Sequence, residues 1–187
     1  MRRSGDFAAL LAGNTISFYK ITDDTVNAVL PAAAAPPACK NFDFIHFEPN
    51  VIALFRITEN NNLVCDVYTV SVSGYFIKRN NFAVINNVRD LCCADEGASA
   101  KLYAVSGNKL HIYDIVNIGN AVSAVKTDVE ISDTSAVSAA IEKGRVHMLL
   151  ADLKNQRYYA YTDSEIMPET DNFNLSFKFL SRWSIYN

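Results

Sequence analysis

The sequence lacks a long apolar segment, has only seven glycines and contains a single tryptophan in 187 residues. No apolar run approaches the roughly 20 residues that a membrane-spanning helix needs. Charged residues make up a fifth of the chain, and the 17 lysines and arginines are scattered. Because a nucleic-acid groove needs a concentrated basic face, direct binding of DNA or RNA is not expected. These absences favour a globular chain that acts on neither membranes nor nucleic acids.

The four cysteines, Cys39, Cys65, Cys92 and Cys93, do not have the spacing of metal ligands. The adjacent pair would point to opposite faces of a strand, so these two thiols could not easily bind one ion. We expect free, buried thiols in a reducing compartment. The apolar run Phe7–Ala12 is shorter than the roughly 7–15 residues of a signal-peptide core, which favours a strand there. The prediction is a soluble, intracellular protein.

The motifs of common catalytic centres are also missing. There is no Gly-x-Ser-x-Gly elbow, phosphate-binding loop or dinucleotide glycine pattern. The nearest approach to a phosphate loop is Gly107–Lys109, which a hairpin turn explains. The three histidines, His46, His111 and His147, have no paired metal-ligand spacing and are interpreted as packed or surface residues. The sequence therefore predicts no catalytic, cofactor-binding or metal-binding residue, and a protein that is not an enzyme.

Three further candidates have ordinary explanations. The carboxylates Asp23–Asp24 and Asp95–Glu96 are interpreted as solvated loop residues, because a glycosidase needs two carboxylates facing each other across a pocket. The acceptor pattern Asn174–Ser176 is a single match in a chain with 18 asparagines. A group of aromatic residues could form a binding face, although core packing is favoured: Phe42, Phe44 and Phe47.

A repeated hairpin pattern is the main positive signal. In Lys101–Ile115, two apolar runs flank a Ser-Gly-Asn-Lys turn, which is typical of a β-hairpin. The same arrangement occurs in Phe7–Ile21, Val51–Val70 and Arg145–Thr162. The sequence therefore predicts one domain of four repeats, covering approximately residues 1–40, 41–86, 87–132 and 133–187.

Each repeat is predicted to contain short strands separated by turns. The predicted strands are Phe7–Ala12, Ile16–Ile21 and Val26–Leu30; Phe42–Phe47, Val51–Ile57, Leu63–Val70 and Gly74–Lys78; Val88–Ala94, Leu102–Val105, Leu110–Val116 and Val122–Val125; and Ala136–Ile141, Val146–Ala151, Arg157–Thr162 and Phe173–Phe179. Between the first two repeats, Pro31–Pro37 cannot be the interior of a helix and is interpreted as an extended surface connector.

Aligning the hairpins on their second strands places a tyrosine in one column: Tyr19, Tyr68, Tyr113 and Tyr161. The tyrosines are 45 to 49 residues apart, within the range of about 40–50 residues per propeller blade. The preceding residues are all apolar, which indicates strands covered on both faces. In repeat length and strand order the chain resembles a β-propeller, although the marks of WD40 and kelch repeats are absent. The alternative is a β-sandwich, because short strands separated by turns also form sandwiches.

The ends of the chain suggest how a propeller-like ring could close. The first repeat is predicted to lack its own opening strand, and Arg182–Asn187 remains after the last predicted strand. We hypothesise that this tail, with Trp183 and Ile185 pointing inward, pairs with Phe7–Ala12. The competing arrangement is an open arc of four repeats whose edges pair with another copy or another protein.

The function expected from the sequence is that of a non-enzymatic structural or scaffold protein acting through protein–protein contacts. Its partners would be other proteins or copies of itself. The asparagine-rich, glycine-poor sequence would suit a component of a large assembly such as a virus particle. The alternative is a propeller that binds or hydrolyses a small ligand or glycan at its central mouth, which requires a lined pocket.

Overall fold

The computed structural model describes residues 1–13, 15–22, 25–31, 37–47, 49–71, 75–96, 99–118, 121–131, 134–142, 145–152, 154–155, 157–162 and 165–166. All the regular secondary structure in these residues is β-strand, so the predicted all-β class is confirmed. Across the same residues, no helix is long and apolar enough to cross a membrane.

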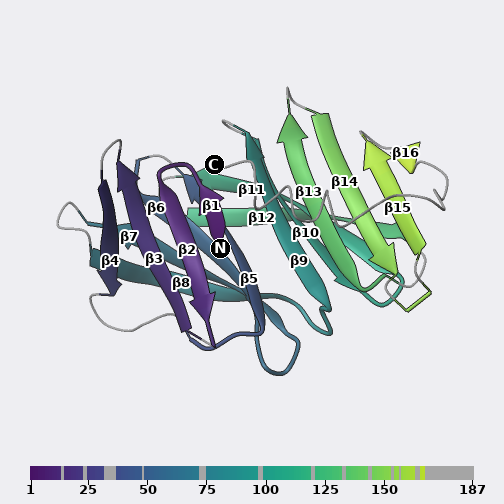
Figure 1. Ribbon diagram of the computed structural model, residues 1–187, viewed down its shortest axis with the longest axis horizontal. Helices are drawn as coiled ribbons and strands as arrows, with labels where there is room; N and C mark the ends of the chain where they lie inside the picture. The colour runs from purple at the N-terminus through teal and green to yellow at the C-terminus, as the bar shows by residue number, and fades with distance from the viewer. Residues whose placement is uncertain are drawn as a thin grey trace.

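The sixteen strands within the described residues fall into four consecutive groups of four, here called units 1 to 4 (Figure 1). Unit 1 contains β1 (Arg2–Ser4), β2 (Phe7–Ala12), β3 (Thr15–Thr22) and β4 (Thr25–Pro31). Unit 2 contains β5 (Asn41–Phe47), β6 (Val51–Ile57), β7 (Leu63–Val70) and β8 (Tyr75–Ile85). Unit 3 contains β9 (Asp90–Glu96), β10 (Ser99–Ser106), β11 (Lys109–Ile118) and β12 (Ala121–Glu130). Unit 4 contains β13 (Ala136–Glu142), β14 (Arg145–Asp152), β15 (Arg157–Thr162) and β16 (Glu165–Ile166).

Within each unit the strands pair antiparallel in chain order, so each unit is a meander. Units 1 and 2 are also joined at their outer strands, where Leu30 and Pro31 of β4 pair in parallel with Tyr75 and Phe76 of β8. This short ladder makes one eight-stranded sheet, whereas units 3 and 4 are separate four-stranded sheets. The pairings among the described residues form no closed sheet, so the exact propeller arrangement is not established by strand pairing.

Most of the predicted strands are present. The bounds of β2, β6, β7 and β15 match the prediction, and the other inner strands agree within a few residues. The outer strands β8 and β12 are longer than predicted, because they continue through polar residues. The predicted last strand, Phe173–Phe179, lies outside the described residues, and the fourth strand of unit 4 is instead β16.

One prediction about the N-terminus is wrong. Unit 1 does have an opening strand, because β1 pairs antiparallel with β2 through Arg2–Ala9, Arg3–Ala8 and Ser4–Phe7. Strand β2 therefore lies between β1 and β3 and has no free edge for the C-terminal tail to join. The tail, Arg182–Asn187, lies outside the described residues.

Consecutive units pack face to face across three apolar cores. The core between units 1 and 2 includes Phe7, Phe18, Phe42, Phe44, Ile52 and Tyr68. The core between units 2 and 3 includes Ile45, Phe55, Val67, Leu102, Tyr113 and Ile115, with Phe47 packed against it. The core between units 3 and 4 includes Tyr103, Leu110, Val137, Met148 and Leu150. Units 2 and 3 are therefore covered on both faces, as the strands with two apolar faces predicted.

The buried thiols and the tyrosine column follow the same packing. All four cysteines are free and buried, as predicted. Cys93 lies in the core between units 2 and 3, whereas Cys92 lies in the core between units 3 and 4. The four tyrosines all occur on the third strand of their unit. Tyr68 and Tyr113 have equivalent surroundings, because each is buried against the preceding unit.

Candidate functional site: polar seams between the units

The opening strands β1, β5, β9 and β13 lie next to one another in series, and each consecutive pair forms what we call a seam (Figure 1). An opening strand is at the end of its sheet, so part of its backbone has no neighbouring strand to bond. At all three seams, a side-chain oxygen of one unit accepts a hydrogen bond from a backbone N–H of the next. Polar side chains thus connect the consecutive units at each seam.

At the seam between units 1 and 2, the acceptor is the buried hydroxyl of Ser4. The N–H of His46 donates to Ser4 Oγ at 2.8 Å, and Ser4 Oγ in turn donates to Asp95 Oδ2 of β9 at 2.8 Å. The His46 ring packs edge-on against Phe7, with ring centroids 4.7 Å apart. At Gly5, φ is +53° and an added Cβ would lie 2.5 Å from His46 Nδ1. Glycine at this position lets β1 approach β5 closely.

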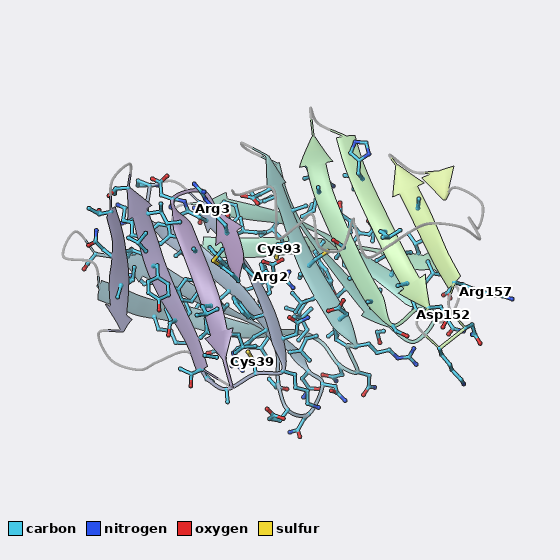
Figure 2. All side chains as sticks on the ribbon, viewed as in Figure 1. Arg2, Arg3, Cys39, Cys93, Asp152 and Arg157 are labelled. Atoms are coloured by element: carbon cyan, nitrogen blue, oxygen red, sulfur yellow. The ribbon has the colours of Figure 1, made fainter. Side chains whose placement is uncertain are left out.

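At the seam between units 2 and 3, the acceptor is the buried carboxylate of Asp43. Its Oδ1 accepts the N–H of Phe44 at 3.0 Å, and its Oδ2 accepts the N–H of Cys93 at 2.8 Å. Arg2 Nε lies 3.8 Å from Asp43 Oδ1 and donates to the Phe42 carbonyl at 3.3 Å. Figure 2 labels Arg2 and Cys93 close together between the units, in agreement with these contacts. One carboxylate thus connects β1, β5 and β9.

At the seam between units 3 and 4, the acceptor is Asp90. Its Oδ2 accepts the N–H of Val137 at 2.9 Å, and its Oδ1 accepts from Asn41 Nδ2 at 2.5 Å. Burial raises the pKa of the Asp90 carboxyl, and hydrogen bonds from the N–H groups of Val137 and Leu91 act in the opposite direction. Because Asn41 is on β5, Asp90 bonds to the units on both sides of it.

Two further polar groups are buried within units, at equivalent places in their sheets. Asp66 of β7 is paired with Arg56 Nε at 2.5 Å and with Lys78 Nζ at 2.7 Å. His111 of β11 is buried, and its Nδ1 lies 2.7 Å from Asp128 Oδ1 on the neighbouring strand. Each is two residues before the tyrosine of the repeated column. The hydrogen bond with His111 is the main cause of the lowered pKa of Asp128.

The predicted histidines and cysteines do not converge. His46 is at the first seam, His111 is paired with Asp128, and His147 is exposed on β14. In the part of the chain that the structure describes, no group of three or more His, Cys, Asp or Glu residues could hold a metal ion. Phe42 and Phe44 are buried in the core between units 1 and 2, and Phe47 packs against the core between units 2 and 3, so core packing, which the sequence favoured, is confirmed.

The remaining candidates divide into turns, strands and undescribed residues. Gly107, with φ of +60°, is in the turn between β10 and β11, as predicted for Gly107–Lys109. The interpretation of Asp95–Glu96 as loop residues is wrong, because both are on β9 and Asp95 accepts the hydrogen bond from Ser4. Asp23–Asp24 and Asn174–Ser176 lie outside the described residues.

The seam acceptors were not identified from the sequence. The available signal was a polar residue within or next to an apolar strand, as with Asp43 in FDFIHF and Asp90 before LCCA. Such a residue is costly to bury unless it is hydrogen-bonded, so each one indicates a partner. The partners are 42, 50 and 47 residues away in the chain, and strand patterns alone do not identify them.

Comparisons with known proteins give a likeness in structure only. No protein-family model matches the sequence, and no curated protein is similar to it in sequence. Among solved structures, the chain is similar to the WD40 domain of SCAP from fission yeast, with a TM-score of 0.48 and 8% sequence identity. The match covers 90% of this chain and 57% of that one, so the chain spans little more than half the length of its structural neighbour.

Proposed function

We propose that this chain is a non-enzymatic scaffold that acts through protein–protein contacts and has its four units arranged in a β-propeller-like way. The observation that carries the proposal is the set of hydrogen bonds that polar side chains make across the seams. Ser4, Asp43 and Asp90 each accept a backbone N–H of the next unit. Their hydrogen bonds hold consecutive opening strands together, which makes the molecule a rigid platform for the binding of other chains.

The three apolar cores support the same function. Each core is shared by two units, so no unit buries its apolar faces alone. Repeats that depend on their neighbours in this way form stable extended surfaces rather than separate domains. Within the scaffold class, we propose a subunit of a large intracellular assembly, such as a virus particle. The supporting features are the repeated units and the asparagine-rich, glycine-poor sequence.

The experiment is to measure the native mass of the endogenous chain, purified under mild conditions from its source. We expect a complex in which other protein chains are present at fixed stoichiometry. A monomer without any partner would contradict the scaffold function. A panel of glycans and small ligands, tested with the same preparation, checks the alternative function. Hydrolysis of one of them would contradict the assignment as a non-enzymatic protein, and specific binding of one would favour the alternative function over the scaffold.

A further inference from the structure

The two faces of each unit have distinct roles in the stack. We call the face toward the preceding unit the trailing face and the face toward the next unit the leading face. In all three apolar cores, the leading face of one unit packs on the trailing face of the next. The series leaves two faces without a following or preceding unit in the described part of the chain: the trailing face of unit 1 and the leading face of unit 4.

The strand register identifies the trailing face of unit 1. Phe7 and Phe18 are in the core with unit 2, so the alternate residues of β2 and β3 point the other way. Ala8 is opposite Tyr19, which is opposite Ala28, and Ile21 is opposite Val26. The trailing face of unit 1 therefore consists of Ala8, Leu10, Ala12, Thr15, Ser17, Tyr19, Ile21, Val26 and Ala28. Among the described strands of unit 1, the charged residue aligned with this face is Arg3, opposite Ala8.

This face has the chemistry of a covered face but is partly exposed. Leu10 occupies the place that Leu54 has in unit 2 and Ala104 has in unit 3, as aligned on the tyrosine column. Leu10 is 42% exposed, whereas Leu54 and Ala104 are both 0% exposed. Val26, at the outer end of the same face, is 67% exposed. An exposed apolar face of this kind indicates a binding surface.

The leading face of unit 4 is the complementary surface. Val137, Ala139, Met148 and Leu150 are in the core with unit 3, so the alternate residues form the leading face. The register aligns Ser138 with Leu149 and Ala160, and Ala140 with His147. Ala140 and His147 are exposed, and Leu149 is half-buried. The same register places Glu142 opposite Arg145 at one end of this face, so a second apolar sheet would pack on its middle part, from Ser138 and Leu149 to Ala140.

We propose that copies of this chain associate head to tail, with the trailing face of unit 1 packed on the leading face of unit 4 of a second copy. The contact continues the three interfaces already present, in which a leading face always meets a trailing face. It identifies a second copy of the chain as one partner and deepens the scaffold function proposed above. Because the two surfaces differ, the contact is heterologous, and repeated contacts build a ring where the rotation closes, with two or more copies, and an open filament where it does not.

The test uses the purified full-length chain and two variants, Leu10→Glu and Ala140→Glu. Each variant places a charge on one of the two faces. Sedimentation velocity should show that the wild-type chain forms larger species as its concentration rises, and that each variant alone is monomeric. The mixture of the two variants should form a 1:1 dimer, because one retains a leading face and the other a trailing face. Val116→Glu is the matched control, because Val116 is 43% exposed on β11, and its association should equal that of the wild type.

Three results would overturn the proposal. A wild-type chain that stays monomeric at all concentrations would mean that the faces meet within one chain or do not meet. Dimers of Ala140→Glu alone would indicate a two-fold contact of the unit 1 face with itself. A mixture of folded variants that remains monomeric would exclude complementarity of the two faces. Circular dichroism of each variant establishes folding. This test uses the purified chain alone, whereas the scaffold function is tested by the native mass of the complex from the source. Failure of the head-to-tail contact would therefore not contradict the scaffold function.

Discussion

Asp66 and Asp43 are both buried carboxylates of unit 2, but they are stabilised in different ways. Asp66 lies within the unit and is paired with two cations, Arg56 and Lys78. Asp43 lies at a seam and accepts two backbone N–H groups, those of Phe44 and Cys93. The first carboxylate compensates a buried charge, whereas the second satisfies donors of an edge strand. Burial alone therefore does not indicate what a carboxylate contributes to stability.

The difference follows from the place of each residue in its sheet. Strand β7 has neighbours on both sides, so its backbone groups bond to β6 and β8. The Asp66 side chain is therefore not needed by the backbone and pairs with Arg56 and Lys78. Strand β5 has only β6 as a strand neighbour, and its outward N–H groups need other acceptors. Side-chain oxygens meet that need and also protect the edge from pairing with foreign strands. Substitutions of three carboxylates test this view, here in order of decreasing expected loss of stability: Asp66, Asp43 and Asp128.

The largest effect is expected for Asp66→Ala. Asp66 is 0% exposed, and its removal leaves the buried Arg56 guanidinium without its carboxylate. Breaking a buried ion pair at one partner costs about 3–5 kcal/mol of folding free energy. Urea unfolding of the variant and the wild type measures the loss.

The double variant Arg56→Met with Asp66→Leu is the control for this prediction. It replaces both charges with apolar groups and should recover most of the lost stability, because apolar replacements of buried pairs are often neutral or stabilising. If the double variant is as unstable as Asp66→Ala, the pair itself, rather than the unpaired Arg56 charge, stabilises unit 2.

A smaller loss is expected for Asp43→Ala, about 1–3 kcal/mol, because the N–H of Cys93 loses its acceptor at a buried site. In contrast to the ion pair, removing Arg2 as well should not restore stability, because Arg2 is 3.8 Å away and is not the main partner. Urea unfolding of Asp43→Ala and of Asp43→Ala with Arg2→Met measures this. Recovery in the double variant would show that Asp43 acts as a counter-ion, which would remove the distinction between the two carboxylates.

The sequence predicted the inner strands well, because these strands combine apolar periodicity with clear turn residues. The strands β6 and β7 flank the Glu59–Asn62 turn, and their predicted bounds agree with the structure. The outer strands were predicted less well. Residues Lys78–Asn81 of β8 and Lys126–Asp128 of β12 are polar and exposed, so hydrogen bonds to a neighbouring strand, rather than burial, define these parts of the strands.

The opening strand β1 could not be predicted from its pattern. It is three residues long, and two of these are arginines. Its place is fixed by pairing with β2 and by contacts of Arg2 and Ser4 with β5 and β9. The seam acceptors depend on equally distant partners, and a periodic pattern carries no information on which N–H meets which oxygen. Strand periodicity therefore predicted the units but not the bonds that connect them.

The smallest effect is expected for Asp128, which is 38% exposed in its side chain and is paired with His111 and Lys126. Its pKa is lowered, first by the hydrogen bond with His111, so the carboxylate stabilises the folded chain above the ordinary carboxyl pKa of about 3.9. This contribution should be lost as the pH falls through the lowered pKa, because the proton then binds the folded state as well. For an exposed pair it amounts to less than about 1 kcal/mol.

The measurement is the difference in unfolding free energy between the wild type and Asp128→Asn at several pH values. The difference should shrink below pH 4, because Asp128 then takes up its proton, first in the unfolded and then in the folded chain. Lys126→Ala serves as the control, because it removes the weaker partner and should retain most of the pH dependence. A difference that does not vary with pH would mean that the His111 contact acts by packing, and the series from Asp66 to Asp128 would then reflect burial rather than charge.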